Sequence, residues 1–386
     1  MQPPTIRSAL NMEQFSGVYK EATTIIDNHI CMTGLLRNGG FDGRVVLCVA
    51  LVSFLGACAG GASRSTAPRD GDTPVPLTDM GQSTYKGFPG GLYPDGANDV
   101  PPSHASAGLQ RARLVAPLDA AGAPSANGKY VLLSIGMSNT TQEFCSQSSA
   151  PPCDSWTLMG LAAADAEVNH TTLALVNGAA GGQAADTWDS PSAANYDRVR
   201  DARLAPLGLT EAQVQVVWIK VARAGPTAAL PADNADAYLL ERDIGNILRA
   251  IKVRYPNVRQ AFLSSRIYAG YATTNLNPEP YAYESGFSVK WTIESQMRQT
   301  DGAAADARAG DLRYDTAAPW SAWGPYLWAD GRTPRSDGLT WVPSDFGADG
   351  THPATSGRAK VGAALLAFFK TSPFTRCWFL AAAPSC

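Results

Sequence analysis

One serine and one aspartate–histidine pair in this chain of 386 residues have the types and spacing that nucleophilic catalysis needs. Ser138 follows an apolar run that ends in Gly136, so we expect its hydroxyl on a turn between a strand and a helix. A serine hydroxyl becomes nucleophilic at neutral pH beside a base, usually histidine. His352 follows Asp349 by three residues, so the carboxylate can fix one ring nitrogen while the other faces the serine. Together, the three residues predict an enzyme that catalyses acyl transfer.

Each of these motifs is weak when taken alone. A serine after a strand is common in turns, and His352 without its context could be a solvated residue at a helix start. An Asp-x-x-His pair also arises by chance in chains of this length. Their order along the chain supports the prediction, because the serine follows the first buried run, glycines follow the second, and Asp349 and His352 precede the last amphipathic segment.

Four apolar runs predict the strands that must position these residues. Each run is continuous rather than alternating, as expected for strands buried on both faces of a parallel sheet. The runs cover residues 130–136, 172–178, 214–222 and 260–267. Helices are predicted at 158–168, 240–251 and 361–369, with one more around 287–297. Strands alternating with helices predict an α/β fold with a mostly parallel sheet covered on both faces and long irregular loops.

Three segments resemble the sequence blocks of SGNH (GDSL-like) hydrolases. LLSIGMSN, which contains Ser138, resembles the first block, with SIGMSN in place of the more familiar GDS. NGAAGGQ resembles the second block, whose glycine N–H helps to form the oxyanion hole, and Gly182 is the best match. FGADGTHPATSGRAKVG, with Asp349 and His352, is similar to the last block, DxxH. The resemblance spans about residues 132–366 and implies a three-layer α/β/α sandwich with a flavodoxin-like sheet, an acyl-serine intermediate, an oxyanion hole from the N–H groups of Ser138 and Gly182, and no cofactor or metal.

The chain departs from the family at its third block. That block supplies an asparagine whose side chain donates to the oxyanion, whereas this chain has WIKVARAGP, with Arg223 at about that place. Arg223 either replaces the asparagine as a charged donor or pairs with a surface acid. Asn139, Asn177 and Lys220 are further candidates. Loss of one preorganised donor costs about 10²–10³ in rate.

The first 58 residues predict export. Arg37 and Arg44 precede a short apolar run at 45–55, a pattern typical of secretory signals. The LGAC sequence that ends at Cys58 resembles a bacterial lipobox, whose cysteine is lipidated. The alternative is a buried strand or helix followed by a chance cysteine. Met32 is a candidate for the true start.

Domain boundaries follow from this pattern. We expect residues 1–58 to be an upstream segment and lipoprotein-like signal, 59–84 a flexible linker, and 85–386 a hydrolase domain. The expected location is the cell envelope, with a lipid anchor as the only membrane contact, or the secreted fraction.

Four cysteines follow the signal and form two local pairs. In an exported chain, an even set of clustered cysteines favours disulfides over free thiols. We expect Cys145–Cys153 to fix the loop after the serine and Cys377–Cys386 to hold the C-terminal tail.

An aromatic-rich stretch at about 269–342 breaks the alternation of strands and helices and is expected to be an insertion. Loops of this kind on an α/β scaffold either bind substrate or pack over the core. Trp320, Trp323 and Trp341, together with Asn139, are the substrate-binding candidates.

Charge and composition exclude one class of function. A formal net charge of -3 and a sequence pI near 5.8 oppose electrostatic binding of nucleic acid. The sequence therefore predicts a serine esterase that deacetylates carbohydrate or hydrolyses small esters. The alternatives are a lipase or thioesterase acting on acyl chains, and a lipid-anchored binding protein that has lost catalysis.

Overall fold

The computed structural model describes residues 70–146, 152–314, 316–382 and 386. The predicted signal, the lipidation of Cys58 and the linker residues 59–69 lie outside the described residues. Within the described ranges, no helix is long and apolar enough to cross a membrane.

Eight strands and nine α-helices are found in the described ranges. The strands are β1 (Asp70–Gly71), β2 (Thr84–Tyr85), β3 (Phe88–Pro89), β4 (Tyr130–Gly136), β5 (Leu173–Asn177), β6 (Val214–Lys220), β7 (Gln260–Leu263) and β8 (Trp320–Trp323). The helices are α1 (Leu77–Met80), α2 (Pro102–Ala112), α3 (Ser138–Phe144), α4 (Leu158–Ala164), α5 (Ala194–Val199), α6 (Asp236–Arg254), α7 (Tyr281–Thr300), α8 (Thr355–Thr371) and α9 (Arg376–Phe379).

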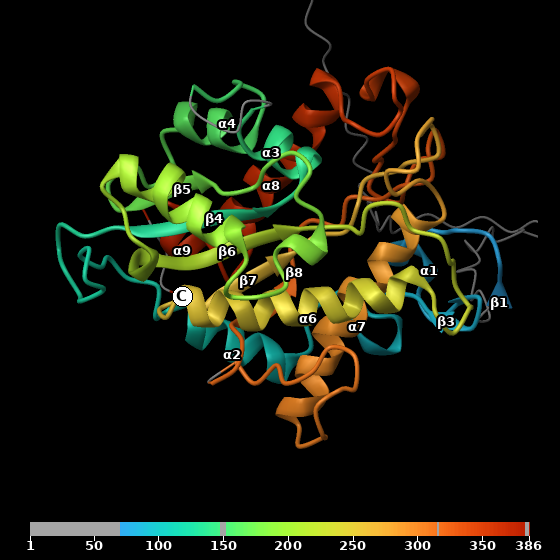
Figure 1. The fold of residues 1–386 in the computed structure, drawn as a ribbon, viewed down its shortest axis with the longest axis horizontal. Coiled ribbons are helices and arrows are strands. Elements are labelled where there is room, and N and C mark those ends of the chain that lie inside the picture. Colours follow the sequence, from blue (N-terminus) through green and yellow to red (C-terminus); the bar gives the residue numbers. More distant parts are fainter. Residues whose placement is uncertain (1–69, 147–151, 315, 383–385) are drawn as a thin grey trace, which may run out of the picture. The chain divides into compact units, whose positions relative to one another are not determined.

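The central sheet consists of five parallel strands in the order β5-β4-β6-β7-β8 (Figure 1). Taken along the chain, this is the order 2-1-3-4-5 of flavodoxin-like folds, in which ligands bind beyond the carboxyl ends of the strands. The predicted α/β fold is therefore confirmed. The four predicted runs contain β4, β5, β6 and β7, and β4 has the predicted bounds.

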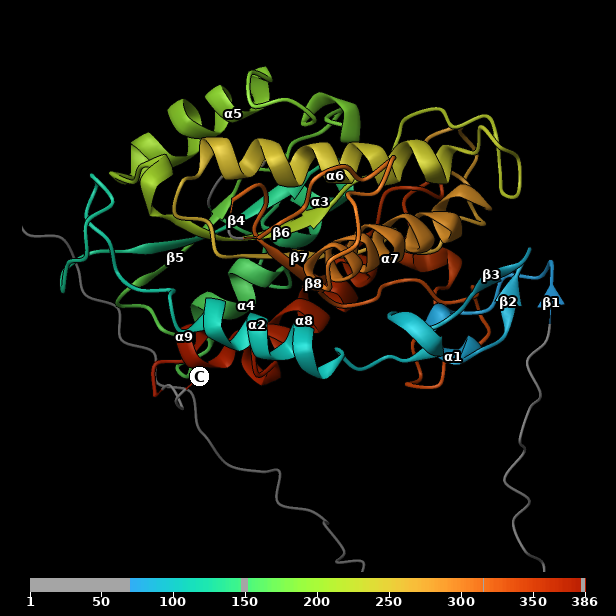
Figure 2. The same cartoon turned by 90° about the horizontal axis from the view of Figure 1, so that it is seen from below.

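Helices cover both faces of this sheet, because alternate residues of each buried strand point to opposite sides. Val131, Leu133 and Ile135 of β4 belong to one core, with apolar side chains of α5, α6 and α7. Tyr130 and Leu132 belong to the other, with side chains of α2, α4, α8 and α9. Figure 2 shows α5 and α6 on one side of the sheet and α2, α4 and α8 on the other. The central sheet therefore lies between two helical layers.

Two predicted boundaries are corrected by the structure. The stretch 269–342 contains α7 and β8, so part of it belongs to the central sheet and its covering helices. Residues 70–84, expected in a flexible linker, form β1 and α1. Leu77 of α1 is fully buried, and its N–H donates to the Tyr326 hydroxyl at 3.1 Å.

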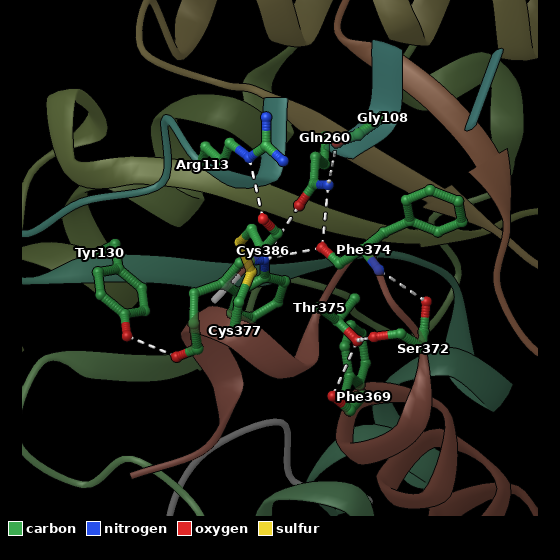
Figure 3. Close-up of a disulfide and its surroundings, with 11 residues drawn as sticks. Gly108, Arg113, Tyr130, Gln260, Phe369, Ser372, Phe374, Thr375, Cys377 and Cys386 are labelled. Atoms are coloured by element: carbon green, nitrogen blue, oxygen red, sulfur yellow. Dashed lines mark hydrogen bonds between the residues drawn. A yellow bond between two sulfur atoms is a disulfide. The ribbon is translucent and has the colours of Figure 1, made fainter. Parts of the chain in front are cut away.

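Both predicted disulfides are present. Cys145–Cys153 closes the loop after α3. Cys377–Cys386 joins α9 to the last residue, whose carbonyl oxygen accepts a hydrogen bond from Arg113 Nε at 3.0 Å (Figure 3). Disulfides of this kind are typical of proteins that fold in an oxidising compartment outside the cytosol.

Candidate active site

Ser138 is the first residue of α3 and lies directly beyond the carboxyl end of β4. The turn before it is tightly packed, because a Cβ atom on Gly136 would lie 2.2 Å from the Lys220 carbonyl oxygen of β6. The Thr140 hydroxyl donates to the same oxygen at 2.6 Å and ties α3 to β6. The serine therefore sits on a fixed turn at the sheet edge.

Asp349 and His352 lie on a loop before α8 that is held by its own hydrogen bonds. Asp349 Oδ1 accepts the backbone N–H groups of Thr351 and His352, each at 3.0 Å. The His352 carbonyl accepts from the Gly347 N–H at 2.8 Å. The Asn139 side chain of α3 donates to the Thr351 carbonyl at 3.1 Å, which joins this loop to the helix that carries the serine.

The structure brings the three predicted side chains together in one row. Ser138 Oγ lies 2.8 Å from His352 Nε2, and His352 Nδ1 lies 2.5 Å from Asp349 Oδ2. With the ring proton on Nδ1, the imidazole donates to Asp349 and accepts from the Ser138 hydroxyl. Burial opposes ionisation of Asp349, but the hydrogen bonds from the His352 side chain and the two backbone N–H groups outweigh it and hold the pKa of this carboxyl below its usual value. The carboxylate is therefore ionised at neutral pH, which keeps the base in the required tautomer.

A cavity of about 320 Å³ opens beside Ser138 and His352. Much of its wall is apolar, from Met137, Ala184, Ala222, Ala224 and Leu276. The remaining lining residues are Asn139, Gly181, Gly182, Arg223, Arg266, Asn277 and Thr351. Small apolar side chains next to a nucleophile leave room for a short acyl group or a small alcohol.

Gly182 lies on the loop after β5 and lines this cavity, as predicted from the second block. Its φ of 75° lies in the left-handed region, which favours glycine. A Cβ atom here would meet no described atom within 4 Å, so the backbone conformation rather than space requires glycine.

The candidates for the missing asparagine have different outcomes. Arg223 lines the cavity, but its Nη1 pairs with the buried Asp243, and its Nε lies 3.8 Å from Asp236. The guanidinium therefore pairs with acids of α6, as the alternative interpretation expected, but its main partner Asp243 is buried and is not a surface acid.

Asn177 and Lys220 are not among the described residues that line the cavity, and both side chains have buried partners. The side chain of Asn177 is buried between the hydroxyls of Ser134 and Thr141, each at 2.6 Å. Lys220 is fully buried and contacts both carboxylate oxygens of Glu143 at 2.5 Å. Burial lowers the pKa of Lys220 to about 8. The prediction that Asn177 serves the oxyanion is corrected, because its amide already joins β4 and α3 to the end of β5.

The three tryptophans expected to bind substrate are core residues. Trp320 and Trp323 belong to β8, and the side chains of Trp320 and Trp341 are fully buried. Trp320 contacts Phe262 and Phe374, and Trp341 contacts Phe346. The described residues that line the cavity include none of the three. The structure agrees with the alternative interpretation, in which these aromatic side chains pack over the core. Of the four substrate-binding candidates, Asn139 is the one that lines the described cavity.

Two other histidines lie outside the described cavity lining. His104 is buried on α2 and its Nε2 lies 2.8 Å from the Ser321 carbonyl. His170, which has Glu167 three residues before it, bonds the Asp165 carbonyl at 3.0 Å. No group of three or more potential metal-binding side chains is found in the described part of the chain.

Sequence analysis missed Arg266 and Asn277, which both line the cavity. Arg266 follows β7 by three residues, at the sheet edge where ligands are expected, but the run 260–267 was assigned entirely to a strand. Asn277 lies in the stretch assigned to an insertion. The strand-end rule did not find Arg266, because β7 ends at Leu263, four residues before the predicted end of the run.

No model of a known protein family matches the chain, and no curated protein matches its sequence. Among solved structures, it is similar to a salicylyl-acyltransferase from a tetracycline biosynthetic pathway, at 14% identity and a TM-score of 0.31 over 65% of this chain and 58% of that one. An extracellular lipase from Streptomyces rimosus matches at 15% identity and a TM-score of 0.30, over 62% of this chain and 99% of that one. A family 2 carbohydrate esterase with a carbohydrate-binding domain, from Corynascus thermopiles (Myceliophthora fergusii), matches at 13% identity and a TM-score of 0.31, over 63% of this chain and 66% of that one. These values do not assign the chain to a family.

Proposed function

We propose that this chain is a serine esterase of the SGNH type that hydrolyses carboxylic esters through an acyl-serine intermediate. The observation that carries the proposal is the continuous row from Ser138 Oγ through the His352 ring to Asp349 Oδ2, with contacts of 2.8 and 2.5 Å at the edge of a cavity. A serine hydroxyl in ordinary turn structure needs neither an oriented imidazole nor a carboxylate behind it.

The proposed reaction has two half-steps. Ser138 Oγ bonds to the ester carbonyl carbon while its proton moves to His352 Nε2, and the carbonyl oxygen takes up the negative charge. That oxyanion collapses, the carbon–oxygen bond to the alcohol breaks, and His352 returns the proton to the departing alkoxide. Water then attacks the acyl-serine in the same way and releases the acid and the free serine. Asp349 stabilises the imidazolium that forms in each half-step.

The backbone N–H groups of Ser138 and Gly182 are the proposed oxyanion donors. Ser138 begins α3, and the first N–H groups of a helix have no partner within the helix. Gly182 borders the same cavity from the neighbouring strand's loop. Preorganised donors at this position typically contribute about 10²–10³ in rate each.

The proposed substrates are short-chain or acetyl esters, including acetylated carbohydrates. Support comes from the cavity volume of about 320 Å³ and its small apolar side chains, since a long acyl chain would have to extend beyond them. The two disulfides fit action outside the cytosol, on substrates of the envelope or its surroundings.

The test uses the purified protein with p-nitrophenyl acetate, butyrate and palmitate and with an acetylated sugar. We expect turnover of the short esters, loss of turnover in Ser138→Ala, and labelling of Ser138 by a fluorophosphonate. Activity on palmitate alone favours the lipase alternative. A folded wild-type protein that turns over none of these esters and resists the label favours the binding protein that has lost catalysis.

A further inference from the structure

The most unusual group in the cavity wall is the side chain of Arg266. The residue is 2% exposed, yet it lines the cavity next to Ser138 and His352. Its Nε and Nη2 atoms are buried and have no hydrogen-bond partner among the residues that the structure describes. A guanidinium is always charged and carries five N–H donors, so a buried one ordinarily binds carboxylates or carbonyl oxygens.

The acidic groups around Arg266 are already engaged with other donors. Glu143 is held by Lys220 Nζ, and Asp349 is held by His352. The Glu279 carboxylate accepts the indole N–H of Trp328 and two backbone N–H groups. These three carboxylates favour the charge of Arg266 through space, although burial lowers the pKa of the guanidinium. The surroundings therefore compensate the charge and leave two donors of the planar fork without a hydrogen bond.

The position of Arg266 in the sheet separates it from the proposed oxyanion donors. In the order β5-β4-β6-β7, Gly182 follows β5, Ser138 follows β4, and Arg266 follows β7. Neighbouring strands lie about 4.8 Å apart, so the ends of β4 and β7 are separated by about 10 Å, on the side away from Gly182. The guanidinium therefore approaches the cavity from the β7 side of Ser138, whereas Gly182 borders it from the β5 side.

We propose that Arg266 binds a carboxylate of the substrate, so that this site selects esters that carry an acid group a few bonds from the scissile carbonyl. The carboxylate would accept two parallel N–H groups of the guanidinium, the geometry in which arginine binds carboxylates best. It is carried by either the acyl part or the alcohol part of the ester. This inference rests on the proposed function, because it identifies the substrate class of the same site.

Paired esters that differ in one charge test the inference. For the acyl side, the pair is 4-nitrophenyl hemiglutarate and 4-nitrophenyl pentanoate. For the alcohol side, it is the acetyl esters of 3-hydroxybenzoate and 3-hydroxybenzamide. The uncatalysed hydrolysis rate of each ester is measured without protein and subtracted. We then expect kcat/KM to be about 10- to 100-fold higher for the carboxylate ester in one pair, the effect of a hydrogen bond to a charged group. Equal or higher kcat/KM for the neutral ester in both pairs overturns the inference, whatever the variants do.

Substitutions assign the preference to Arg266. Arg266→Gln should reduce the ratio of charged to neutral kcat/KM to about one, whereas Arg266→Lys should keep part of it. Arg223→Gln is the matched control, because Arg223 lines the same cavity but is committed to Asp243; its ratio should stay that of the wild type. A ratio that survives in a folded Arg266→Gln protein refutes the assignment.

Binding of benzoate and benzamide, measured by calorimetry on Ser138→Ala, separates this inference from the proposed function. Tighter binding of benzoate that disappears in Ser138→Ala/Arg266→Gln supports the carboxylate site even if no ester is turned over. If esters are turned over without a carboxylate preference and benzoate binds no better than benzamide, the carboxylate site is rejected. The proposed esterase activity is then still supported.

Discussion

The sharpest consequence of the site geometry concerns Asp349→Asn. Asparagine keeps an oxygen that can accept the two backbone N–H groups at 3.0 Å, so the loop retains its shape. At the position of Oδ2, however, an NH₂ group now faces His352 Nδ1, where a carboxylate oxygen lay at 2.5 Å. Two donors cannot share that contact, so the ring proton moves to Nε2 and points at Ser138. The imidazole then cannot accept the serine proton.

We expect kcat to fall by about 10³–10⁴-fold with p-nitrophenyl acetate, because the wrong tautomer of His352 dominates. At 1.36 kcal/mol per tenfold, this corresponds to a barrier raised by about 4–5.5 kcal/mol. KM should change by less than about threefold, because Asp349 contributes nothing to the described cavity lining. Fluorophosphonate labelling should slow in parallel with kcat.

Asp345→Asn is the matched control, since Asp345 is a buried aspartate of the same region that pairs with Lys360 rather than with the histidine. It should lower stability while leaving kcat within about threefold. An Asp349→Asn protein that keeps more than a tenth of the wild-type kcat refutes the tautomer argument.

Three further predictions concern stability. Leu77 is fully buried although its position was expected to be linker, so Leu77→Ala should lower the free energy of unfolding by about 2–5 kcal/mol in urea titrations. Val75 is partly exposed, and Val75→Ala should lower it by less than about 0.5 kcal/mol. Equal effects would mean that α1 does not pack on the domain. Replacing Cys145 and Cys153 together by serine opens a loop with a sequence separation of 8, and the loop-entropy relation gives a loss of about 2.5 kcal/mol; a thermal scan in which the double variant melts with the wild type contradicts this. Burial raises the pKa of Glu284 to about 7, above its unfolded value of about 4.3, so the folded state holds this proton more tightly and stability should fall as pH rises from about 4.5 to 8. Glu284→Gln should flatten that fall in urea titrations at pH 5 and pH 8, and an unchanged slope would exclude Glu284 as its source.

The sequence predicted the sheet well where strands are long and buried on both faces. The run at 130–136 became β4 without change, because a continuous apolar stretch ended by glycine fits few other structures. β8 was missed because its four residues, Trp320–Trp323, lie among prolines and glycines and show no period. Its place at the edge of the sheet depends on packing against β7 and α2, which no local pattern records.

The same distinction holds for the site. Ser138, Asp349 and His352 could be predicted because each follows or precedes a recognisable element, and parallel strands bring such positions to one edge. Burial was harder to foresee. α3 has the polar sequence SNTTQEF, yet all but its first residue are buried, with Thr140 bonded to β6 and Glu143 to Lys220. The tryptophans expected to bind substrate fill the core, and of the two arginines in the cavity lining, Arg266 has donors without a hydrogen-bond partner.

The contact between Gly350 and Tyr271 has a consequence for engineering. Gly350 has a φ of 64°, and a Cβ atom there would lie 1.8 Å from the Tyr271 carbonyl oxygen. The Thr273 N–H also donates to the Asp349 carbonyl at 2.9 Å. The loop that carries the base is thus seated on the segment that follows β7, which also leads to Asn277. A chimera that grafts a foreign specificity segment into 269–277 must bring the matching 347–352 loop with it, since exchanging either one alone would unseat His352.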